Sequence, residues 1–480
     1  MESVLKPIVL VINYFSLFYV VLISSIYLLQ LISATIGLRK YSKSLKYTDY
    51  ERFQESDNMV PISVLVPAYN EAATIADNTR NLLSLDFPQY EVVVVNDGSK
   101  DETMEILRES FKLVPIHIPF KRSIPTKEIR GVYRSAMYPN LVVIDKENGG
   151  KADALNAGIN ASMYPVFISI DADSILEKSS LMKIVYAFMN DPNCVAVGGI
   201  VRIGSGCKIV DGELVKVDLA NKPLLMLQTN EYLRAFLTGR IGFHQMGMLL
   251  IISGAFGAFR KQAVIDVGGY TTGCIGEDME LVVKLHKSMR DQKRTYSVKF
   301  LPDPVCWTQP PERFGDLKKQ RKRWQIGLID TLLKHKDMLC NPHYGRIGLA
   351  CLPYFWMFEL FGPIFEVAGY VAVPLSYLFG IINIRFMISF YLLAVLYGTI
   401  LSVGALLLEE NTFRKYPKID QLLKLFVFAI IDNLGYRQIN TIYKVEAMIS
   451  FRKNRSSWGT IKRRTFQADS KNKQQKSVEQ

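Results

Sequence analysis

Two aspartates one residue apart, Asp171 and Asp173, follow the apolar run Phe167-Ile-Ser-Ile170. Two carboxylates at that spacing can hold a hard divalent cation, and the cation in turn can hold a diphosphate. An aspartate that caps the next helix would produce the same pattern. The strand-like run before the pair and the motifs described below favour the cation site.

Two further motifs carry groups that suit a charged ligand. Asp97-Gly98-Ser99 closes a run of valines, although it could also be a plain turn. In the stretch from Asn148 to Asn156, two glycines let the backbone approach a ligand, and Lys151 can meet phosphate charge. The helix predicted to follow offers its positive end. The spacing excludes a Walker loop.

The run Gln320-Arg-Lys-Arg-Trp324 lies just before an apolar C-terminal third. It combines an amide, a charged fork and a flat aromatic face, which suit a sugar acceptor handled beside a bilayer. Trp324 could instead be an interfacial membrane anchor. Arg321 and Lys322 could belong to a solvated or lipid-facing charge run.

Composition indicates that part of this 480-residue chain faces lipid, because 49% of its residues are apolar and 21% charged. Residues 7–37 contain no Asp, Glu, Lys, Arg or His and exceed the roughly 20 residues needed to cross a bilayer. We expect a retained span rather than a signal peptide. The basic residues that follow it place residue 39 onward in the cytoplasm.

The tail after Phe451 carries nine basic residues against two acidic ones. Because no stacking module accompanies them, we expect attraction to an anionic lipid surface and no nucleic acid. The six cysteines form no CxxC pair, so we interpret all as structural. His244 and His286 are also interpreted as structural.

Short β-branched runs at 62–67, 92–96, 141–145 and 166–171 predict strands, and helices are predicted at 72–85, 101–111 and 151–162. This alternation predicts an α/β fold with a parallel sheet. Ligands bind at the carboxyl ends of such strands, where the acidic motifs lie. Residues 112–140, rich in proline, are predicted to be an insertion or mobile loop.

The C-terminal third is predicted to hold an interfacial helix near 345–357 and spans over 358–382 and 386–408. The sequence of residues 421–450 favours an interfacial or re-entrant helix pair. A full crossing of the membrane would leave the basic tail outside, against the charge rule. Glu359 and Glu366 lie in apolar sequence. They could line a saccharide path or pair with Arg437 or Lys444.

In this order the motifs resemble the processive inverting family-2 glycosyltransferases, which include cellulose, hyaluronan and chitin synthases and, most closely, poly-N-acetylglucosamine synthase. The resemblance covers roughly residues 60–330. It implies a nucleotide-diphospho-sugar transferase fold of GT-A type with a mixed, mainly parallel sheet, plus transmembrane helices. It also implies a UDP-sugar donor and Mg²⁺ or Mn²⁺ as cofactor.

The resemblance also implies roles for individual residues. Asp278, next to Glu277, would be the catalytic base, and Asp171 and Asp173 would bind the donor and the metal. Here the motif reads Gly276-Glu-Asp, whereas the family often has Thr-Glu-Asp, so an orienting hydroxyl is missing. The donor-binding residues would be Ala68, Tyr69, Glu71, Asp97, Lys151, Asp153, Asp171 and Asp173. The acceptor or diphosphate would be met by Gln320, Arg323, Trp324, Phe256 and Gly257.

We therefore predict a multi-pass enzyme of the cell membrane that extends a polysaccharide and exports it, with accessory export proteins as candidate partners. We predict N-acetylglucosamine as the donor sugar, with glucose and glucuronate as the next candidates. One alternative is a single transfer to a lipid or wall acceptor, and another is a transporter or scaffold with an inactive transferase domain. The predicted layout is a span at 1–38, a basic linker at 39–59, a cytoplasmic catalytic domain at 60–340, membrane helices at 341–450 and a basic tail at 451–480.

Overall fold

The computed structural model describes residues 2–48, 50, 59–117, 121–210, 213–416 and 418–451. The chain divides into two compact units. The sheet unit holds residues 40–221 and 249–310, and the helical unit holds residues 1–39, 222–248 and 311–451. The basic tail and most of the linker at 49–58 lie outside the described residues.

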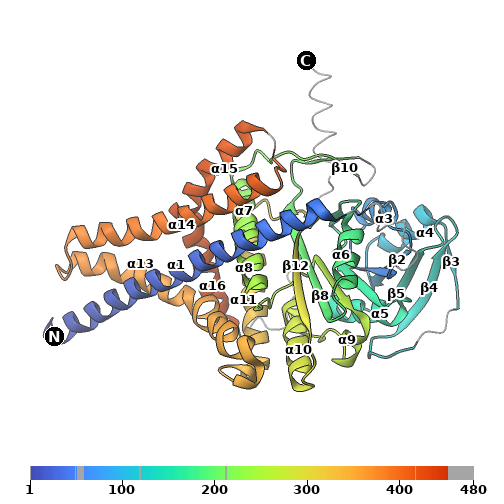
Figure 1. The fold of residues 1–480 in the computed structure, drawn as a ribbon, viewed down its shortest axis with the longest axis horizontal. Helices are drawn as coiled ribbons and strands as arrows, with labels where there is room; N and C mark the ends of the chain where they lie inside the picture. The colour runs from blue at the N-terminus through green and yellow to red at the C-terminus, as the bar shows by residue number, and fades with distance from the viewer. Residues whose placement is uncertain are drawn as a thin grey trace, which may run out of the picture. The chain divides into compact units, whose positions relative to one another are not determined.

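The sheet unit is built on a ten-stranded sheet in the order β3-β4-β5-β2-β1-β6-β11-β8-β12-β7 (Figure 1). Its longest ladders, β8–β12, β1–β2 and β2–β5, are parallel, whereas β11 runs antiparallel between β6 and β8. The predicted mixed sheet is therefore confirmed. The strands are β1 (Ile62–Ala68), β2 (Tyr90–Asp97), β3 (Leu113–Pro115), β4 (Ile129–Ser135), β5 (Leu141–Lys146), β6 (Val166–Ile170), β7 (Ile175–Leu176), β8 (Cys194–Ile203), β11 (Phe256–Arg260) and β12 (Ser297–Thr308), with β9 (Lys208–Val210) and β10 (Glu213–Lys216) in a separate pair.

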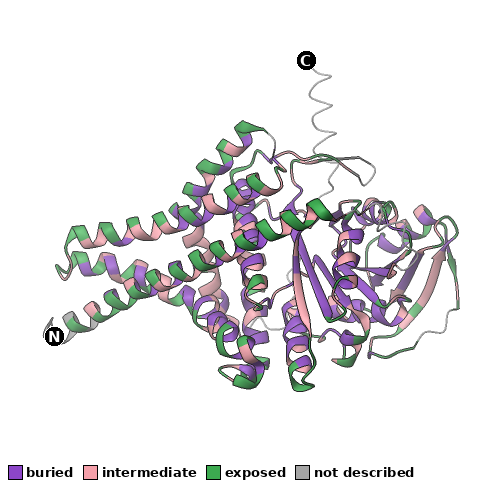
Figure 2. Cartoon of the chain, in the orientation of Figure 1, coloured by how far each residue is buried: buried purple, intermediate pink, exposed green. Residues whose placement is uncertain are grey.

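Helices cover the central strands, and β1, β2 and β6 are buried along almost their whole length (Figure 2). The helix α5 packs on β1 and β2, and α6 packs on β8 and β12. Gly158 in α5 brings that helix close to Leu65 and Val95, since a Cβ there would lie 3.4 Å from each. The helices of the sheet unit are α3 (Ile75–Leu83), α4 (Thr103–Phe111), α5 (Lys151–Ala161), α6 (Ser180–Met189), α9 (Lys261–Asp266) and α10 (Glu277–Asp291).

Residues 112–140 are not simply a loop, and that prediction was wrong in part. They contain β3 and β4, which pair with each other and, through β4, with β5 at the edge of the sheet. The strand β4 is mostly half-exposed and carries Arg130 and Arg134, so it lacks the apolar run by which a buried strand is found. Residues 118–120 lie outside the described residues.

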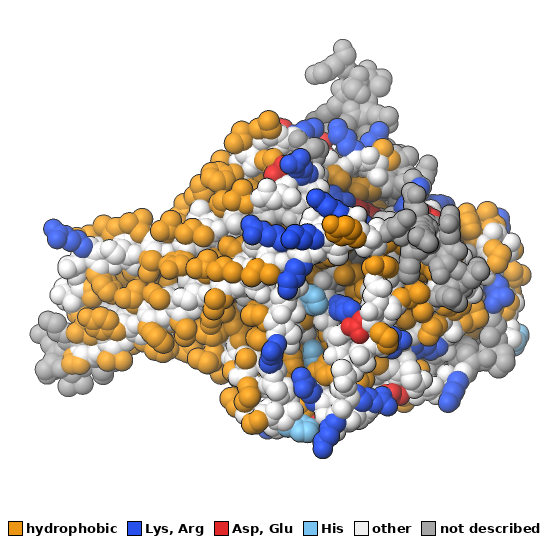
Figure 3. Space-filling model, viewed as in Figure 1, with side chains coloured by type: hydrophobic (Ala, Val, Ile, Leu, Met, Phe, Trp, Pro, Cys, Tyr) orange, Lys and Arg blue, Asp and Glu red, His pale blue; other side chains and the backbone are white. Residues whose placement is uncertain are grey.

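Three helices among the described residues are long and apolar enough to cross a membrane, and they lie wholly or mostly in the helical unit: Val9–Tyr47, Ile347–Leu378 and Ile384–Thr412. On the face shown in Figure 3, hydrophobic side chains follow the lengths of α1, α13 and α14. These helices are those of a membrane protein. The helices of this unit are α1 (Glu2–Tyr47, up to Arg39), α7 (Pro223–Leu233), η1 (Arg234–Arg240), α8 (Ile241–Gln245), α11 (Phe314–Lys334), η2 (Lys336–Met338), η3 (Pro342–Tyr344), η4 (Ile347–Cys351), α12 (Leu352–Tyr354), η5 (Phe355–Leu360), α13 (Gly362–Leu378), α14 (Ile384–Thr412), α15 (Ile419–Ile431), η6 (Asp432–Tyr436) and α16 (Arg437–Ile449).

The segment predicted as a helix pair at 421–450 consists of α15 and α16, each 13 residues long. The two are separated at Leu434 and Gly435, whose backbone angles are not helical. At 1.5 Å per residue each helix is about 20 Å long, shorter than the roughly 30 Å of a hydrocarbon core. The placement of this pair in the membrane stays a prediction.

The predicted catalytic domain at 60–340 does not form one contiguous unit. Residues 222–248 and 311–340, which carry α7, η1, α8 and α11, pack with the helical unit. Polar bonds account for this packing, because Asn230 donates to the carbonyl of Leu425 at 2.9 Å and Arg234 pairs with Asp432 at 2.6 Å.

Candidate active site

Asp97, at the end of β2, is enclosed by the loop before α5. Its Oδ1 accepts from Lys146 Nζ at 2.6 Å and from the N–H of Gly149 at 3.0 Å, and its Oδ2 accepts from the N–H of Gly150 at 2.7 Å. Gly150 has φ +86°, a backbone conformation that glycine adopts without strain. Asp97 therefore fixes the glycine loop that begins α5.

Lys146, at the end of β5, has no solvent exposure and pairs with a second carboxylate, Asp153 Oδ1, at 2.6 Å. Asp153 also accepts the backbone N–H of Lys127 at 3.1 Å. Asp97 at the end of β2 and Asp153 in the first turn of α5 thus share one buried ammonium group, which offsets part of their charge. The predicted direct contacts of Asp97 and Asp153 with the nucleotide stay predictions.

The loops after β1 and β2 are joined to each other. The N–H of Asn70 donates to Ser99 Oγ at 3.0 Å, and the N–H of Lys100 donates back to Asn70 Oδ1 at 2.8 Å. The N–H of Glu71 donates to Thr103 Oγ1 at 2.9 Å. Ala68 and Glu71 are buried, whereas the Tyr69 ring is 42% exposed. Of these three residues, Tyr69 is the exposed one, and the donor-binding roles of Ala68, Tyr69 and Glu71 stay predictions.

Lys151, the first residue of α5, connects the end of β6 to the segment before β11. Its Nζ lies 2.5 Å from Asp171 Oδ1, 3.7 Å from Glu277 and 3.3 Å from the carbonyl oxygen of Gly254. Burial opposes the charge on Lys151, but Asp171, Glu277 and Asp278 outweigh burial and raise the pKa of its ammonium group. Lys151 is therefore a fixed positive charge among carboxylates.

Gly254 separates Lys151 from Asp278. Its N–H donates to Asp278 Oδ2 at 2.9 Å, while Asp278 Oδ1 accepts the N–H of Met279 at 2.8 Å. A Cβ on Gly254 would lie 3.0 Å from Lys151 Nζ and 3.4 Å from Asp278. A series of contacts runs from Asp97 through the glycine loop and Lys151 to Asp171, Gly254 and Asp278. These contacts bring the predicted acidic motifs into one site.

The pair Asp171 and Asp173 fits a hard divalent cation that arrives with a diphosphate. Mg²⁺ usually takes one or two protein carboxylates and completes its shell with phosphate oxygens and water. Among the described residues, no cluster of three His, Cys, Asp or Glu side chains forms a complete protein site. Two carboxylates suit a cation whose other ligands come from a diphosphate and water, and the metal role of Asp171 and Asp173 stays a prediction.

Phe256 and Gly257, predicted to support the acceptor, lie in the core of the sheet. Phe256 is fully buried, and its ring occupies the space beside Gly199. Gly257 pairs with Ser169 on one side and Gly198 on the other. Both residues are buried, and the part of this segment that contacts Lys151 and Asp278 is Gly254, so the acceptor role of Phe256 and Gly257 stays a prediction.

The run from Gln320 to Trp324 lies on α11 in the helical unit. Trp324 is 46% exposed and Arg323 is half-buried, whereas Arg321 is buried. Arg321 pairs with Glu231 at 2.7 Å, and Lys322 pairs with Glu446 at 2.7 Å. The reading of Arg321 as a solvated or lipid-facing charge was therefore wrong. The acceptor roles of Gln320, Arg323 and Trp324 stay predictions.

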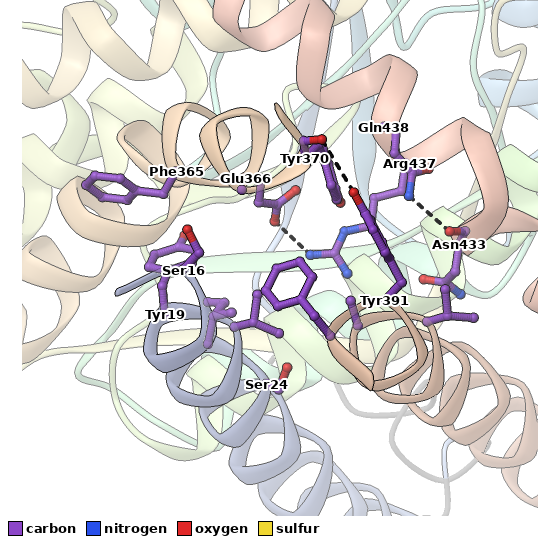
Figure 4. Close-up of a pocket in the computed structure, with 16 residues that line it drawn as sticks. Ser16, Tyr19, Ser24, Phe365, Glu366, Tyr370, Tyr391, Asn433, Arg437 and Gln438 are labelled. Carbon is purple, nitrogen blue, oxygen red and sulfur yellow. Dashed lines mark hydrogen bonds and ion pairs between the residues drawn. The ribbon is translucent and has the colours of Figure 1, made fainter. Parts of the chain in front are cut away.

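An ion pair lies among the apolar helices of the helical unit. Arg437 donates to Glu366 at 2.7 Å, and Thr441 donates to the other Glu366 oxygen at 3.1 Å. The pair borders a pocket, with the rings of Tyr19 and Tyr391 among its lining (Figure 4). Of the partners expected for Glu366, Arg437 is thus the one observed.

Lys146, Gly254, Glu231 and Tyr436 were not identified from the sequence. Lys146 is a lysine at the end of an otherwise apolar strand that lies beside acidic motifs, and this was the available signal. Glu231 and Tyr436 are 205 residues apart and meet only in the folded chain.

The sheet is mixed, and its central parallel strands carry acidic residues at their carboxyl ends, as in the nucleotide-diphospho-sugar transferase fold of GT-A type. Residues 63–267 match the family Glycosyl transferase family 2, and residues 166–403 match Glycosyl transferase family group 2. These two overlapping matches together extend from residue 63 to residue 403.

Among characterised proteins, the chain is similar to poly-beta-1,6-N-acetyl-D-glucosamine synthases. It is 32% identical to that of Staphylococcus aureus strain COL over 306 residues, which cover 63% of this chain and 61% of the relative. It is 32% identical to that of Staphylococcus epidermidis over 308 residues, 64% of this chain and 62% of the relative. The chain thus spans less than two thirds of the length of these relatives.

Two solved structures are weakly similar to the chain. The mannosyltransferase PcManGT from Pyrobaculum calidifontis, in complex with GDP-Man and Mn²⁺, has a TM-score of 0.49 and 19% identity, covering 86% of this chain and 99% of its own. S. aureus TarS 1–349 has a TM-score of 0.34 and 16% identity, covering 79% and 91%. Likenesses this distant assign no ligand.

Proposed function

We propose that the protein is a membrane-embedded inverting glycosyltransferase that transfers a sugar from a UDP-sugar to a growing polysaccharide. The observation that carries the proposal is the position of Lys151. It lies between Asp171, a donor-side carboxylate, and Gly254, whose N–H holds Asp278. A charge for the leaving diphosphate and a base for the incoming alcohol are thereby within one site.

The reaction that this site supports is a single displacement at the anomeric carbon. The acceptor hydroxyl oxygen forms a bond to that carbon as the bond to the UDP oxygen breaks, and UDP leaves with the bonding electron pair. Asp278 accepts the proton of the hydroxyl. Two backbone N–H groups hold its carboxylate, so the base has a fixed orientation.

The diphosphate would be met by Lys151 and by the N-terminus of α5, which no side chain caps. Asp171 and Asp173 would hold a divalent cation, which supplies charge neutralisation to the leaving group when bound. Lys151 must then release Asp171 and turn toward phosphate oxygens.

We propose N-acetylglucosamine as the donor sugar, since the relatives are named poly-beta-1,6-N-acetyl-D-glucosamine synthases. We also propose a multi-pass placement with the catalytic residues in the cytoplasm, because Arg39, Lys40 and Lys43 follow the first span. Extension and export of a polymer, with accessory export proteins, belong to the same proposal.

The test is UDP release from a panel of UDP-sugars by enzyme purified in detergent. UDP-N-acetylglucosamine should support release, EDTA should abolish it, and Mg²⁺ or Mn²⁺ should restore it. A ladder of products on a gel supports chain extension, whereas one discrete glycolipid indicates a single transfer. Absence of UDP release with every donor would contradict the proposal.

The base is tested by Asp278→Asn, which should lower turnover by roughly 10²–10⁴-fold while UDP still binds. Asp291→Asn, at the exposed far end of the same helix, is the matched control and should keep wild-type turnover. Equal turnover in Asp278→Asn and Asp291→Asn would remove Asp278 from the mechanism.

A further inference from the structure

Arg321 has an environment unlike that of a surface arginine. Only 2% of its side chain is exposed, and its Nη2 donates to Glu231 Oε2 at 2.7 Å and to the Tyr436 hydroxyl at 3.4 Å. The Tyr436 hydroxyl in turn donates to Glu231 Oε2 at 2.7 Å. The three side chains come from α11, α7 and η6 and form a closed triangle of hydrogen bonds.

The guanidinium group of Arg321 also lies against an aromatic ring. Its central carbon is 4.4 Å from the centroid of Trp324, three residues later on α11. Arginine stacks well in this way because its guanidinium is planar. Since Trp324 remains 46% exposed, the stack leaves much of the tryptophan available to a ligand.

The element that carries Tyr436 is itself anchored. In η6 the helix is broken at Leu434 and Gly435, and Asp432 at the start of η6 is fully buried. Arg234 donates both to Asp432 at 2.6 Å and to Ser402 of α14 at 2.6 Å. Contacts with η1 and α14 therefore anchor the start of the element that carries Tyr436.

We infer that Glu231, Tyr436 and Arg321 are positioning residues that hold the Trp324 ring in the orientation in which it stacks on the acceptor sugar. The inference rests on the proposed function, because it requires a saccharide acceptor. Glu231 and Tyr436 fix the guanidinium plane, and the guanidinium plane fixes one face of the ring. Flat aromatic faces suit the apolar side of a pyranose, so a ring held in place binds an acceptor without an ordering cost.

The test measures steady-state transfer from UDP-N-acetylglucosamine to a β-1,6-linked N-acetylglucosamine pentasaccharide. Tyr436→Phe and Glu231→Gln should each raise the acceptor KM by roughly threefold to thirtyfold. The donor KM should stay at the wild-type value. Arg321→Lys keeps the charge and loses the planar stack, so it should raise the acceptor KM as well. Lys319→Gln, at an exposed site on the same helix, is the control and should leave both constants unchanged.

A double-mutant cycle separates positioning from a structural role. In a Trp324→Ala background, Tyr436→Phe should change neither the acceptor KM nor pentasaccharide binding measured by calorimetry, because the ring that it positions is gone. Effects of equal size in both backgrounds would overturn the inference, as would an unchanged acceptor KM in both single variants of an active enzyme. A wild-type protein that transfers no sugar would instead overturn the proposed function, and the inference with it.

Discussion

The backbone N–H of Gly254 donates to Oδ2 of Asp278 at 2.9 Å, and this bond links the segment before β11 to the first turn of α10. The carbonyl of the same residue accepts from Lys151 at 3.3 Å. One glycine thus sets the separation between the proposed base and the cationic group that would meet the leaving diphosphate.

Gly254→Ala should reduce turnover by about tenfold with little loss of stability, because the new methyl group would lie 3.0 Å from Lys151 Nζ and displace it. Turnover and the thermal midpoint are measured together. Gly315→Ala is the matched control, since a Cβ there has no neighbour within 4 Å. Wild-type turnover in Gly254→Ala would show that the separation is not critical.

Lys146→Met should destabilise the sheet unit by about 3–5 kcal/mol, because it leaves the buried carboxylates of Asp97 and Asp153 without their cation. Thermal unfolding followed by circular dichroism measures the loss. Lys216→Met removes a lysine that is 57% exposed and should change stability by less than about 0.5 kcal/mol. Equal midpoints for the two variants would contradict the shared-cation arrangement.

His286 should make stability depend on pH between about 4 and 6.5. Burial lowers the pKa of its imidazole to about 4, and Tyr296 and the carbonyl of Leu249 occupy its two nitrogens. Because the folded pKa lies below the unfolded value of about 6.5, the unfolded chain binds more protons in this range. Stability is therefore complete above pH 6.5 and decreases as the pH falls toward 4.

The decrease should amount to about 3 kcal/mol and should be smaller in His286→Gln. Thermal midpoints between pH 4 and 7 measure it, with His343→Gln at an exposed position as the control. Parallel pH profiles for wild type and His286→Gln would show that His286 does not contribute.

The strand ends were predictable from the sequence, whereas the partners of their side chains were not. Runs such as Val92–Asn96 predict buried strands because both faces of a covered parallel sheet are apolar. The acidic residues that end or follow these strands were therefore placed correctly at the carboxyl ends of the parallel strands. Their shared cation, Lys146, reaches Asp97 across 49 residues of chain, and no local pattern specifies such a contact.

Arg321 illustrates the same limit. A run of three basic residues has the composition of a solvated surface, and the burial of Arg321 results from Glu231 and Tyr436, which are 90 and 115 residues away. The edge strand β4 was missed for a different reason. A half-exposed edge strand needs no continuous apolar pattern, so its sequence resembles a loop.

The pair Glu366–Arg437 yields a prediction about the helical unit. Glu366→Gln should lower stability by about 3–5 kcal/mol, because Arg437 would keep its charge among apolar helices without a carboxylate. In the double variant Glu366→Gln with Arg437→Gln neither charge of the pair remains, so much of the loss should be recovered.

Glu410→Gln, whose carboxylate lies 4.0 Å from the exposed Arg414, is the control and should behave as wild type. Thermal unfolding in detergent measures all four proteins, and a double variant less stable than Glu366→Gln would show that Arg437 stabilises the helices through contacts other than this ion pair.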